Sequence, residues 1–404
     1  MIRAMGNTKK PIPASVPEGA ETVPRSRQKL RAIEEHLAGT YCFRYNVVKD
    51  VVEWGRVDGT VAFGVLEPYD LNSLVRELEH AGHTIGADRL LRLLQSDFVP
   101  RVDPLNAYFA TLPATTGVST IAALAATVLV EDPVEWERFL TKWIVACVAN
   151  VLLLDGCQNH TCLVLIGGQG LYKTTWLNLL CPPSLAAQYL FTGKIDPDNK
   201  DTLSLLAENL LLNIDDQLAL LTGRSSDALK TLITLPAVKI RRPYAPLFTH
   251  LPRRASFMAS VNEGGFLTDA TGSRRFLPVH AQQIDIGAAQ GISMDHVWAE
   301  AYALFRQGYR YWFDAAETEA LNVRNDAFRH TTVEYDVVAK YLTPGTTPCT
   351  LAELKSELQR RSGLPMLADS KLGAALKQQQ FIITQPRSTE TGAARPRYYG
   401  VHWR

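Results

Sequence analysis

The sequence predicts an α/β fold in which a parallel sheet with flanking helices is joined to a smaller module on either side. Three continuous apolar runs, at residues 161–166, 210–214 and 255–261, are typical of strands buried on both faces. Helical segments separate these runs, and strands that alternate with helices indicate a parallel sheet. The length of 404 residues allows two or three domains, each with its own core.

The charge balance limits the classes of protein to which the chain can belong. It has 42 lysines and arginines against 41 aspartates and glutamates, a net charge of +1. This balance excludes a uniformly basic coat protein and a strongly acidic tail. A nucleic-acid-binding protein of this composition must therefore place its cations locally. The basic residues gather at positions 9–10, 25–31, 239–242, 253–254, 274–275 and 387–404.

The cysteines and the apolar segments bear on the cellular compartment. The six cysteines form no CxxC pair, which argues against a zinc site, and they are too sparse for a disulfide scaffold. We expect free, mostly buried thiols in a reducing cytoplasm. No apolar core follows the N-terminal charges, so no signal peptide is expected. The apolar stretch 143–154 is too short to span a bilayer, so no membrane contact is expected.

Before the core, residues 1–25 are predicted to form a disordered basic arm, and residues 26–103 a small α+β module. Leucine and valine at helical spacing indicate its helices, and β-branched and aromatic residues indicate its strands. The expected helices are 25–37, 71–81 and 87–94, and the expected strands are 41–51 and 61–65.

The core is predicted to span residues 104–330 and to be helical throughout from 104 to 154. Asp132 followed by proline marks the start of its longest helix. Residues 331–404 are predicted to form a winged-helix-like module, because three helical patterns precede two strands. The expected helices there are 333–341, 351–361 and 370–379, and the expected strands are 381–384 and 397–401.

A candidate phosphate-binding loop follows the first buried strand and opens a helix, which is the context that such a loop requires. Its backbone N–H groups can bind an anion, Lys173 can contact the β- and γ-phosphates of ATP, and the Thr174 hydroxyl can ligate Mg²⁺. The alternative is an ordinary glycine-rich turn. The expected nucleotide-binding residues are Gly167, Gly168, Gln169, Gly170, Leu171, Tyr172, Lys173, Thr174 and Thr175.

One position departs from the usual pattern of this loop. Tyr172 stands where a glycine is expected before the lysine. If that position needs a positive φ, a tyrosine there is strained. The other interpretation is that the loop follows a different path and that the tyrosine ring shields the site.

Polar residues end the second and third buried strands. Asp215 is expected to hold Mg²⁺ together with Thr174, directly or through water, and Asp216 to orient or deprotonate the attacking water. Asn262 ends the third strand and can bind the γ-phosphate or that water, because ligands bind at the carboxyl ends of parallel strands. The alternatives are two solvated acids at a strand end and a turn-forming asparagine.

Two adjacent arginines, Arg274 and Arg275, lie in a Gly/Ser-containing turn. If one reaches the nucleotide of a neighbouring subunit, it acts as an arginine finger that stabilises charge in the transition state. The sequence leaves open which of the two does so. The alternative is a surface pair that binds nearby acids.

A basic element follows the acidic pair along the chain. Residues 238–244 alternate as in a half-exposed strand, and two prolines favour a hairpin or edge element. Cations interleaved with an aromatic residue suit single-stranded nucleic acid. A solvated basic strand, or contacts with ATP or a neighbouring subunit, are equally good interpretations. The candidate nucleic-acid-binding residues are Lys239, Arg241, Arg242, Tyr244 and His250.

In this order, the motifs resemble the virulence-associated E family of phage, plasmid and genomic-island proteins, over roughly residues 105–330. The run 266–276 is the most specific part of the resemblance. Members of that family are similar to superfamily 3 helicases of the AAA+ class. The resemblance therefore implies an AAA+-like P-loop core and an ATP-dependent ring motor, usually hexameric, that translocates on DNA during replication initiation.

The resemblance also implies roles for single residues, and two departures from the family limit it. Tyr172 replaces the loop glycine. The primase domain that is often fused upstream is not expected, because the first hundred residues are too short and lack an acidic metal triad. The implied roles are the Walker A pair for Lys173 and Thr174, the Walker B pair for Asp215 and Asp216, the sensor for Asn262, the arginine finger for Arg274 or Arg275, and the DNA-tracking hairpin for residues 239–244.

The leading functional prediction is an ATP- and Mg²⁺-dependent motor that moves single-stranded DNA through the central channel of a homo-oligomeric ring. ATP would lie between subunits, and the C-terminal module and the basic arm would add contacts to duplex DNA. One alternative is a nucleotide-gated DNA-binding assembly with little hydrolysis. Another is an anti-phage defence ATPase whose motor is coupled to a sensor.

Overall fold

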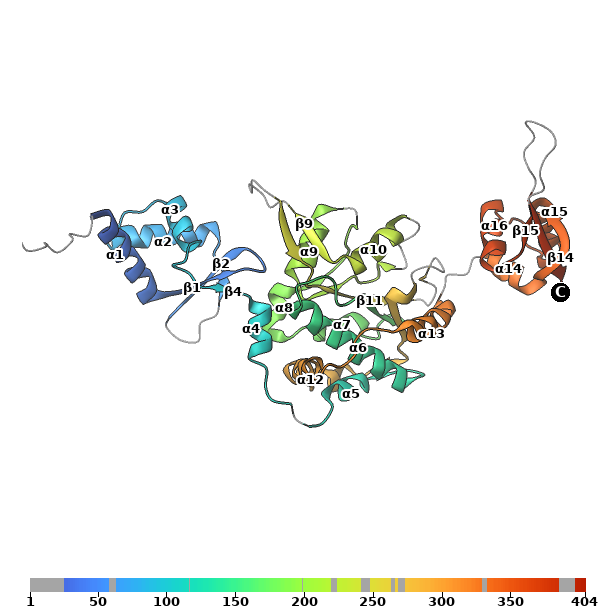
Figure 1. The fold of residues 1–404 in the computed structure, drawn as a ribbon, viewed down its shortest axis with the longest axis horizontal. Helices are drawn as coiled ribbons and strands as arrows, with labels where there is room; N and C mark the ends of the chain where they lie inside the picture. Colours follow the sequence, from blue (N-terminus) through green and yellow to red (C-terminus); the bar gives the residue numbers. More distant parts are fainter. Residues whose placement is uncertain are drawn as a thin grey trace, which may run out of the picture. The chain divides into compact units, whose positions relative to one another are not determined.

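The chain divides into two compact units, Met1–Asp103 and Pro104–Arg404. The expected basic arm, except for its last residue, lies outside the residues that the structure describes. The computed structural model (Figure 1) describes residues 25–57, 63–115, 117–197, 199–218, 224–240, 248–262, 266–267, 273–328, 333–384 and 397–404.

The N-terminal unit is a four-stranded sheet with the strand order β3-β2-β1-β4, packed against helices whose leucines fill its core. The three predicted helices are confirmed. The single strand expected over 41–51 was wrong, because the Asn46 side chain accepts hydrogen bonds from the N–H groups of Val48 and Lys49 and so builds a turn. The elements are α1 (Arg25–Thr40), β1 (Tyr41–Asn46), β2 (Val51–Arg56), β3 (Gly64–Val65), α2 (Pro68–His80), α3 (Ala87–Leu94) and β4 (Arg101–Val102).

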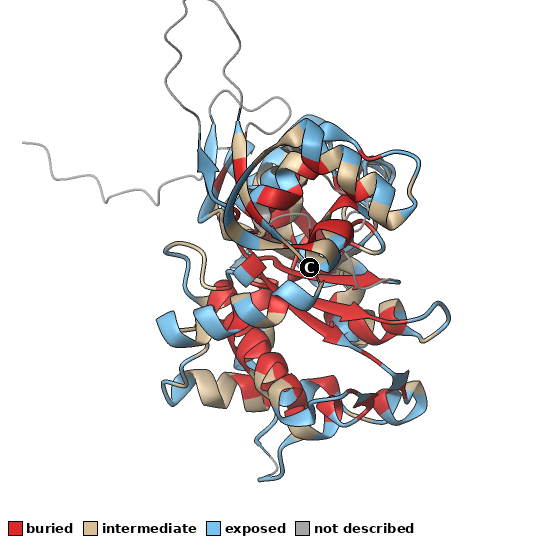
Figure 2. Ribbon diagram, turned by 90° about the vertical axis from the view of Figure 1, so that its right-hand side faces the viewer, coloured by how far each residue is buried: buried red, intermediate tan, exposed pale blue. Residues whose placement is uncertain are grey.

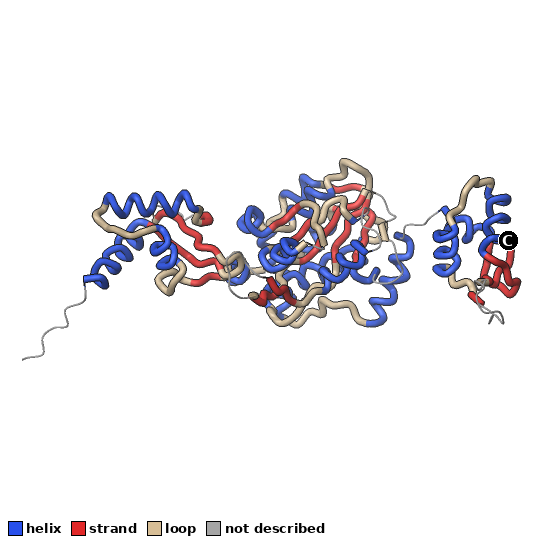
Figure 3. Tube along the Cα trace, turned by 90° about the horizontal axis from the view of Figure 1, so that it is seen from above, coloured by secondary structure: helices blue, strands red, loops and turns tan. Residues whose placement is uncertain are grey.

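The core of the second unit is a five-stranded sheet in which every pair of neighbours is parallel, with helices around it (Figure 3). The predicted mixed α/β fold with a parallel sheet is confirmed. Its strand order is β12-β6-β11-β8-β7, and β6, β11 and β8 are the three strands expected from the apolar runs. The strands are β6 (Cys162–Ile166), β7 (Leu190–Thr192), β8 (Leu211–Asn213), β11 (Ser256–Val261) and β12 (Phe276–His280).

Helices and short strands complete this core. The expectation of helix throughout 104–154 was wrong between α4 and α5, where the described residues form no helix, and at β5, which pairs with β13. The remaining elements are α4 (Pro104–Ala110), α5 (Thr120–Ala125), β5 (Val128–Leu129), α6 (Pro133–Leu152), α7 (Lys173–Leu179), α8 (Pro183–Tyr189), α9 (Lys200–Glu208), α10 (Arg224–Thr234), β9 (Ala237–Ile240), β10 (Thr249–Pro252), η2 (Ser273–Arg275), β13 (Gln283–Ile284), α11 (Ile286–Gln290), α12 (Met294–Arg306), α13 (Ala315–Asn325) and η3 (Asp326–Phe328).

Helix α6 begins at Pro133, directly after Asp132, as the sequence predicts. The Asp132 carboxylate caps the helix, because it accepts a hydrogen bond from the Glu135 N–H at 3.0 Å. Most of the helix is buried, including the polar Asn150. The Asn150 amide donates to the carbonyl oxygens of Arg254 and Ala255 and accepts from the Gln158 N–H. This asparagine therefore satisfies backbone groups where the chain enters β11.

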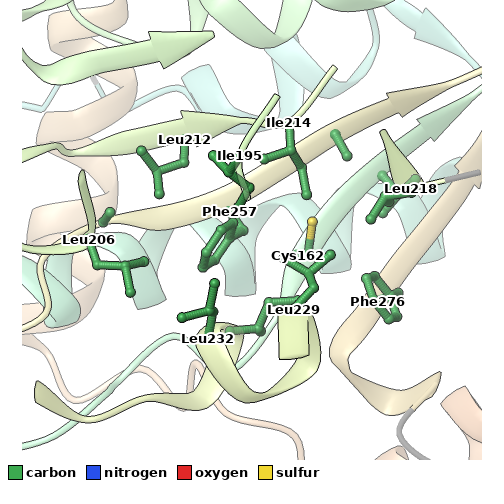
Figure 4. Close-up of a cluster of buried hydrophobic side chains, with 14 of the residues drawn as sticks. Cys162, Ile195, Leu206, Leu212, Ile214, Leu218, Leu229, Leu232, Phe257 and Phe276 are labelled. Atoms are coloured by element: carbon green, nitrogen blue, oxygen red, sulfur yellow. The ribbon is translucent and has the colours of Figure 1, made fainter. Parts of the chain in front are cut away.

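Apolar side chains from the sheet and from helices α9 and α10 form one continuous cluster (Figure 4). Phe257 of β11 lies near its centre, with leucines of α9 and α10 around it. Buried residues concentrate in the central strands and become fewer toward the surface (Figure 2). The packed sheet therefore offers a rigid support for the residues that follow its strands.

The C-terminal part of the chain has its own apolar cluster, formed by three helices and an antiparallel sheet with the order β14-β16-β15. The expected helices and the two expected strands are confirmed, while the strand β14, which carries two prolines and a bulge, was not predicted. The winged-helix-like description stays a prediction. The elements are α14 (Val333–Tyr341), β14 (Leu342–Thr350), α15 (Leu351–Ser362), α16 (Asp369–Gln378), β15 (Ile383–Thr384) and β16 (Tyr398–Trp403).

All six cysteines are free thiols. Within the described ranges, no helix is both long and apolar enough to cross a lipid bilayer.

Candidate functional site

Strand register brings the predicted loop, the acidic pair and the asparagine to one edge of the sheet. In the pairing of β6 with β11, Ile166 lies opposite Val261, so Gly167 and Asn262 leave their strands side by side. The Gly167 N–H donates to the Val261 carbonyl oxygen at 3.2 Å. On the other side of β11, the Asp216 N–H donates to the Ser260 carbonyl oxygen at 3.1 Å. Three neighbouring strands thus end in one polar cluster.

Lys173 lies at the centre of this cluster, and its side chain is largely buried. Its ammonium group donates to the carbonyl oxygens of Gly167 and Gly168 at 2.9 and 2.8 Å, and to Asn262 Oδ1 at 3.0 Å. An ammonium has three N–H donors, so all three are used. Burial lowers the pKa of Lys173, and the nearby carboxylates of Asp216 and Asp215 partly counteract that shift.

The loop backbone depends on glycine at two positions. A Cβ at Gly167 would lie 2.6 Å from the Ala281 carbonyl oxygen and 2.9 Å from Leu171 Cδ1, so no larger residue fits. Gly170 has φ = 83°, a conformation that glycine adopts without strain. The loop can therefore turn tightly while its N–H groups stay close to the start of α7.

Tyr172 takes the left-handed conformation, with φ = 60° and ψ = 21°. The first of the two interpretations of this residue is therefore the one observed: the loop keeps the backbone path that a glycine would follow, and the tyrosine is strained. The strain of a left-handed non-glycine residue is about 1–2 kcal/mol. The ring is 58% exposed, so burial of the side chain contributes little in return.

A second group of oxygens forms around Asp215. Thr174 Oγ1 donates to Asp215 Oδ1 at 2.7 Å, and the Ser260 hydroxyl donates to the same carboxylate oxygen. The two hydroxyl oxygens are 3.3 Å apart. Sequence reasoning missed Ser260, because no local signal marks a serine inside a buried strand as a partner of Asp215.

Asp216 is held separately. Asn262 Nδ2 donates to both of its carboxylate oxygens, at 3.0 and 3.1 Å. Since the other end of the same amide accepts from Lys173, one asparagine connects the loop lysine to the second aspartate. Asp216 also has φ = 49°, in the left-handed region. The two adjacent aspartates therefore have different partners.

The oxygen groups around Asp215 fit a magnesium ion. Thr174 and Asp215, the predicted metal ligands, offer a hydroxyl and a carboxylate, which are hard oxygen donors of the kind that Mg²⁺ prefers. Ser260 adds a third oxygen. No cluster of three or more histidine, cysteine, aspartate or glutamate residues is found in the part of the chain that the structure describes.

The two arginines lie at the other edge of the sheet. Arg275 precedes Phe276, and Phe276 pairs with Cys162 at the start of β6, whereas the loop follows the end of that strand. Five residues of strand separate the two edges by about 16 Å. Arg274 is exposed and Arg275 is half-buried, and both line a cavity of about 820 Å³. The structure therefore does not bring these arginines to the loop of their own chain.

The basic element is a hairpin in which β9 and β10 pair in antiparallel register. Lys239 lies opposite His250, and both are exposed. The Lys239 ammonium also lies 5.4 Å from the ring centre of the exposed Phe248, an aromatic residue that the sequence interpretation did not include. Arg241, Arg242 and Tyr244 lie outside the described residues, so their predicted contacts stay predictions.

The neighbouring arginines at 253 and 254, which the sequence counted among the local basic clusters, are buried. Arg253 is completely buried and donates to the carbonyl oxygens of Asn159 and Ile233 and to the Cys157 thiol. Its pKa is lowered by burial. Both arginines therefore support the fold and offer no charge to a nucleic acid.

The model of the virulence-associated protein E-like domain matches residues 112–330, more than half of the chain. The chain belongs to this family. The virulence-associated protein E-like domain thus contains the loop, both aspartates, Asn262 and both arginines. The predicted range of the resemblance, roughly 105–330, agrees with the matched residues.

No curated protein matches the chain. Solved structures that are similar to it include the apo structure of the NrS-1 C-terminal region, at 11% identity and a TM-score of 0.49, covering 93% of this chain and 99% of that one. The A form of the same region in the apo state has 12% identity and a TM-score of 0.48, with 93% and 99% covered.

Proposed function

We propose that this virulence-associated E-like chain is an ATP- and Mg²⁺-dependent DNA motor of the AAA+, superfamily 3 kind, that works as a head-to-tail ring and serves replication of a mobile element. One observation carries the proposal. A phosphate-loop lysine, two aspartates and a polar strand-end residue meet at the carboxyl ends of three adjacent parallel strands. Ligands of open parallel sheets bind at this edge.

The residues divide the work of ATP hydrolysis between them. Lys173 and the loop N–H groups would bind the β- and γ-phosphates, because they offer positive charge beside a closely turned backbone. Thr174 and Asp215 would hold Mg²⁺, which neutralises phosphate charge when it is bound. Asp216 would orient the attacking water and accept its proton, in an orientation that Asn262 fixes through two hydrogen bonds.

The arrangement of the two edges supports a multi-subunit motor. An arginine finger from Arg274 or Arg275 must come from another copy, since about 16 Å of sheet separates both residues from the loop of their own chain. A head-to-tail contact that closes forms a ring. The exposed hairpin with Lys239, Phe248 and His250 offers a cation beside an aromatic ring, which suits single-stranded DNA in a central channel.

Hydrolysis of ATP, measured with and without single-stranded DNA, tests the proposal. We expect DNA-stimulated turnover in the wild type and loss of ATP binding in Lys173→Ala. The matched control is Lys194→Ala, which removes an exposed lysine and should leave both binding and turnover unchanged. A wild type that binds no ATP and hydrolyses none with any nucleic acid would falsify the proposal.

The same assay separates the motor from a nucleotide-gated DNA-binding assembly. The strained Tyr172 at the start of α7 is the observation that favours this second candidate, because a strained residue directly before Lys173 would slow turnover. Tight ATP binding with negligible hydrolysis, and DNA binding that depends on nucleotide, would favour the assembly over the motor.

A further inference from the structure

Tyr172 presents an aromatic ring at the mouth of the phosphate loop. The residue is strained, and its ring is 58% exposed. A glycine would follow the same backbone path without strain. Strain of this kind persists where the surrounding structure maintains it, and it occurs often at functional sites. Burial of the exposed ring by a second molecule would therefore offset the backbone strain.

The opposite edge of the sheet contains a cavity of about 820 Å³, lined mostly by polar residues together with three consecutive aromatic residues, 311–313, and the two arginines. Thr161, directly before β6, marks its place at the amino ends of the strands. Arg274 and Trp312 both line it, and Tyr172 of the same chain does not. The volume is sufficient for an aromatic side chain together with neighbouring atoms of the segment that carries it.

The wall that carries Trp312 is rigid. The buried Lys142 donates to the carbonyl oxygens of Arg310 and Trp312, at 3.1 and 2.9 Å, and lies 3.3 Å from a carboxylate oxygen of Glu317. The ring of Tyr311 packs edge-on against that of Trp312, with 5.2 Å between their centres. Although held in this way, Trp312 is 55% exposed. A fixed, exposed aromatic ring loses little side-chain entropy when a partner binds.

We propose that Tyr172 of one copy docks into this cavity of the adjacent copy, against Trp312 and beside Arg274. The occupant is thus a second copy of the same chain. The two features lie at opposite edges of one sheet, so they meet when copies associate head to tail. An aromatic pair with an arginine nearby combines apolar burial with ring and cation–π contacts. This inference rests on the proposed ring.

The docking makes the loop residue before Lys173 part of the subunit interface. Movement of the loop on nucleotide binding is then transmitted directly to the neighbouring copy. The docking also explains why a strained tyrosine stands where a glycine would be unstrained. The contacts that its ring makes in the interface offset the free energy of the strained loop backbone.

Tyr172→Gly provides the sharpest test, since it restores an unstrained loop while removing the ring. Assembly is measured by analytical ultracentrifugation over a range of protein concentrations with a non-hydrolysable ATP analogue, and binding of the analogue is measured separately. We expect Tyr172→Gly and Trp312→Ala each to raise the concentration needed for assembly about tenfold or more. The double variant should be little worse than either single one, because both remove the same contact.

Tyr172→Phe keeps the ring and should assemble as the wild type does, and Tyr69→Ala, which removes an 81% exposed tyrosine of α2, serves as the matched surface control. If Tyr172→Gly assembles as readily as the wild type, or if the effects of the two single variants add fully, the docking is wrong while the proposed ring stands. If the wild type stays monomeric although it binds the analogue, both the ring and the docking are overturned.

Discussion

The two edges of the central sheet differ in how completely their polar side chains are hydrogen-bonded to one another. At the carboxyl edge, the side chains of Lys173, Thr174, Asp215, Asp216 and Asn262 are all hydrogen-bonded within the cluster. At the amino edge lies a large open cavity with an exposed arginine. Close to it, Arg253 Nε and Nη2 have no hydrogen-bond partner within the described part of the chain. The polar groups of the carboxyl edge are thus paired within one chain, whereas the amino edge has an open cavity and unpaired arginine atoms among the described residues.

This contrast predicts that variants of the hydrogen-bonded cluster at the carboxyl edge change catalysis while leaving the fold intact, and that variants at the amino edge change stability or assembly. Tyr172 lies at the carboxyl edge but outside that cluster, so its substitution is expected to change stability and assembly instead. Four predictions test it, beginning with the largest expected effect.

Asp216→Asn should reduce ATP turnover by about 10²–10⁴-fold, because an amide cannot accept the proton of the attacking water. Affinity for ATP should stay within a few-fold of the wild type, since asparagine tolerates the left-handed backbone at this position. Steady-state turnover and equilibrium nucleotide binding check the two parts. Asp201→Asn, in the first turn of α9, is the control. Unchanged turnover would contradict the assignment of Asp216 as the base.

Asn150→Ala should lower the free energy of unfolding by about 3 kcal/mol, because it leaves buried backbone groups of Arg254, Ala255 and Gln158 without partners. Asn150 lies at the amino edge of the sheet, where the comparison predicts effects on stability. Urea denaturation followed by circular dichroism measures the change. A midpoint like that of the wild type would show that these backbone groups find other partners.

Ser260→Ala should raise the Mg²⁺ concentration needed for half-maximal ATPase activity about tenfold, because the Asp215 carboxylate loses a hydrogen bond that orients it. Turnover at saturating Mg²⁺ should change little. Ser256→Ala is a matched control on the same strand, since Ser256 is the buried first residue of β11 and lies four residues before Ser260. If both variants raised the required Mg²⁺ concentration equally, the effect of Ser260→Ala would come from a change in strand β11 and not from the hydrogen bond to Asp215.

Tyr172→Gly should stabilise the isolated chain by about 1 kcal/mol, because relief of the left-handed strain exceeds the entropy that glycine loses on folding. Thermal unfolding at a concentration where the protein is monomeric measures this effect. The same substitution weakens assembly if the docking holds, so one residue would change stability and association in opposite directions. A destabilised monomer would contradict the account of strain at Tyr172.

Much of the carboxyl edge could be predicted from the sequence because its signals are local. Apolar runs identified β6, β8 and β11. The loop after the first run and the polar residues directly after the other two, Asp215 and Asn262, are those that the structure places in the cluster. Ser260 escaped prediction because its role depends on register: a serine inside a buried strand becomes informative only when Asp215 is known to lie beside it.

The amino edge and the outer strands were harder to predict. β12 contains Pro278, which argues against a strand in the interior of a sheet, but β12 is an edge strand and tolerates it. Burial of Arg253 could not be predicted, because its partners are carbonyl oxygens and a thiol far away in the sequence. The cavity wall at Trp312 likewise depends on Lys142 of α6, which precedes Trp312 by 170 residues in the sequence.

The three acceptors around Lys173 also bear on the proposed exchange of nucleotide. If the site binds a phosphate as proposed, each Lys173 donor that loses an oxygen of the departing product has Gly167, Gly168 or Asn262 within 3.0 Å, so the buried ammonium keeps its hydrogen bonds. An incoming phosphate would in turn displace these internal acceptors, so its measured affinity would report the difference between two hydrogen-bonded states. The protein would then compete with its own ligand, and product release and closure of the loop would be one event.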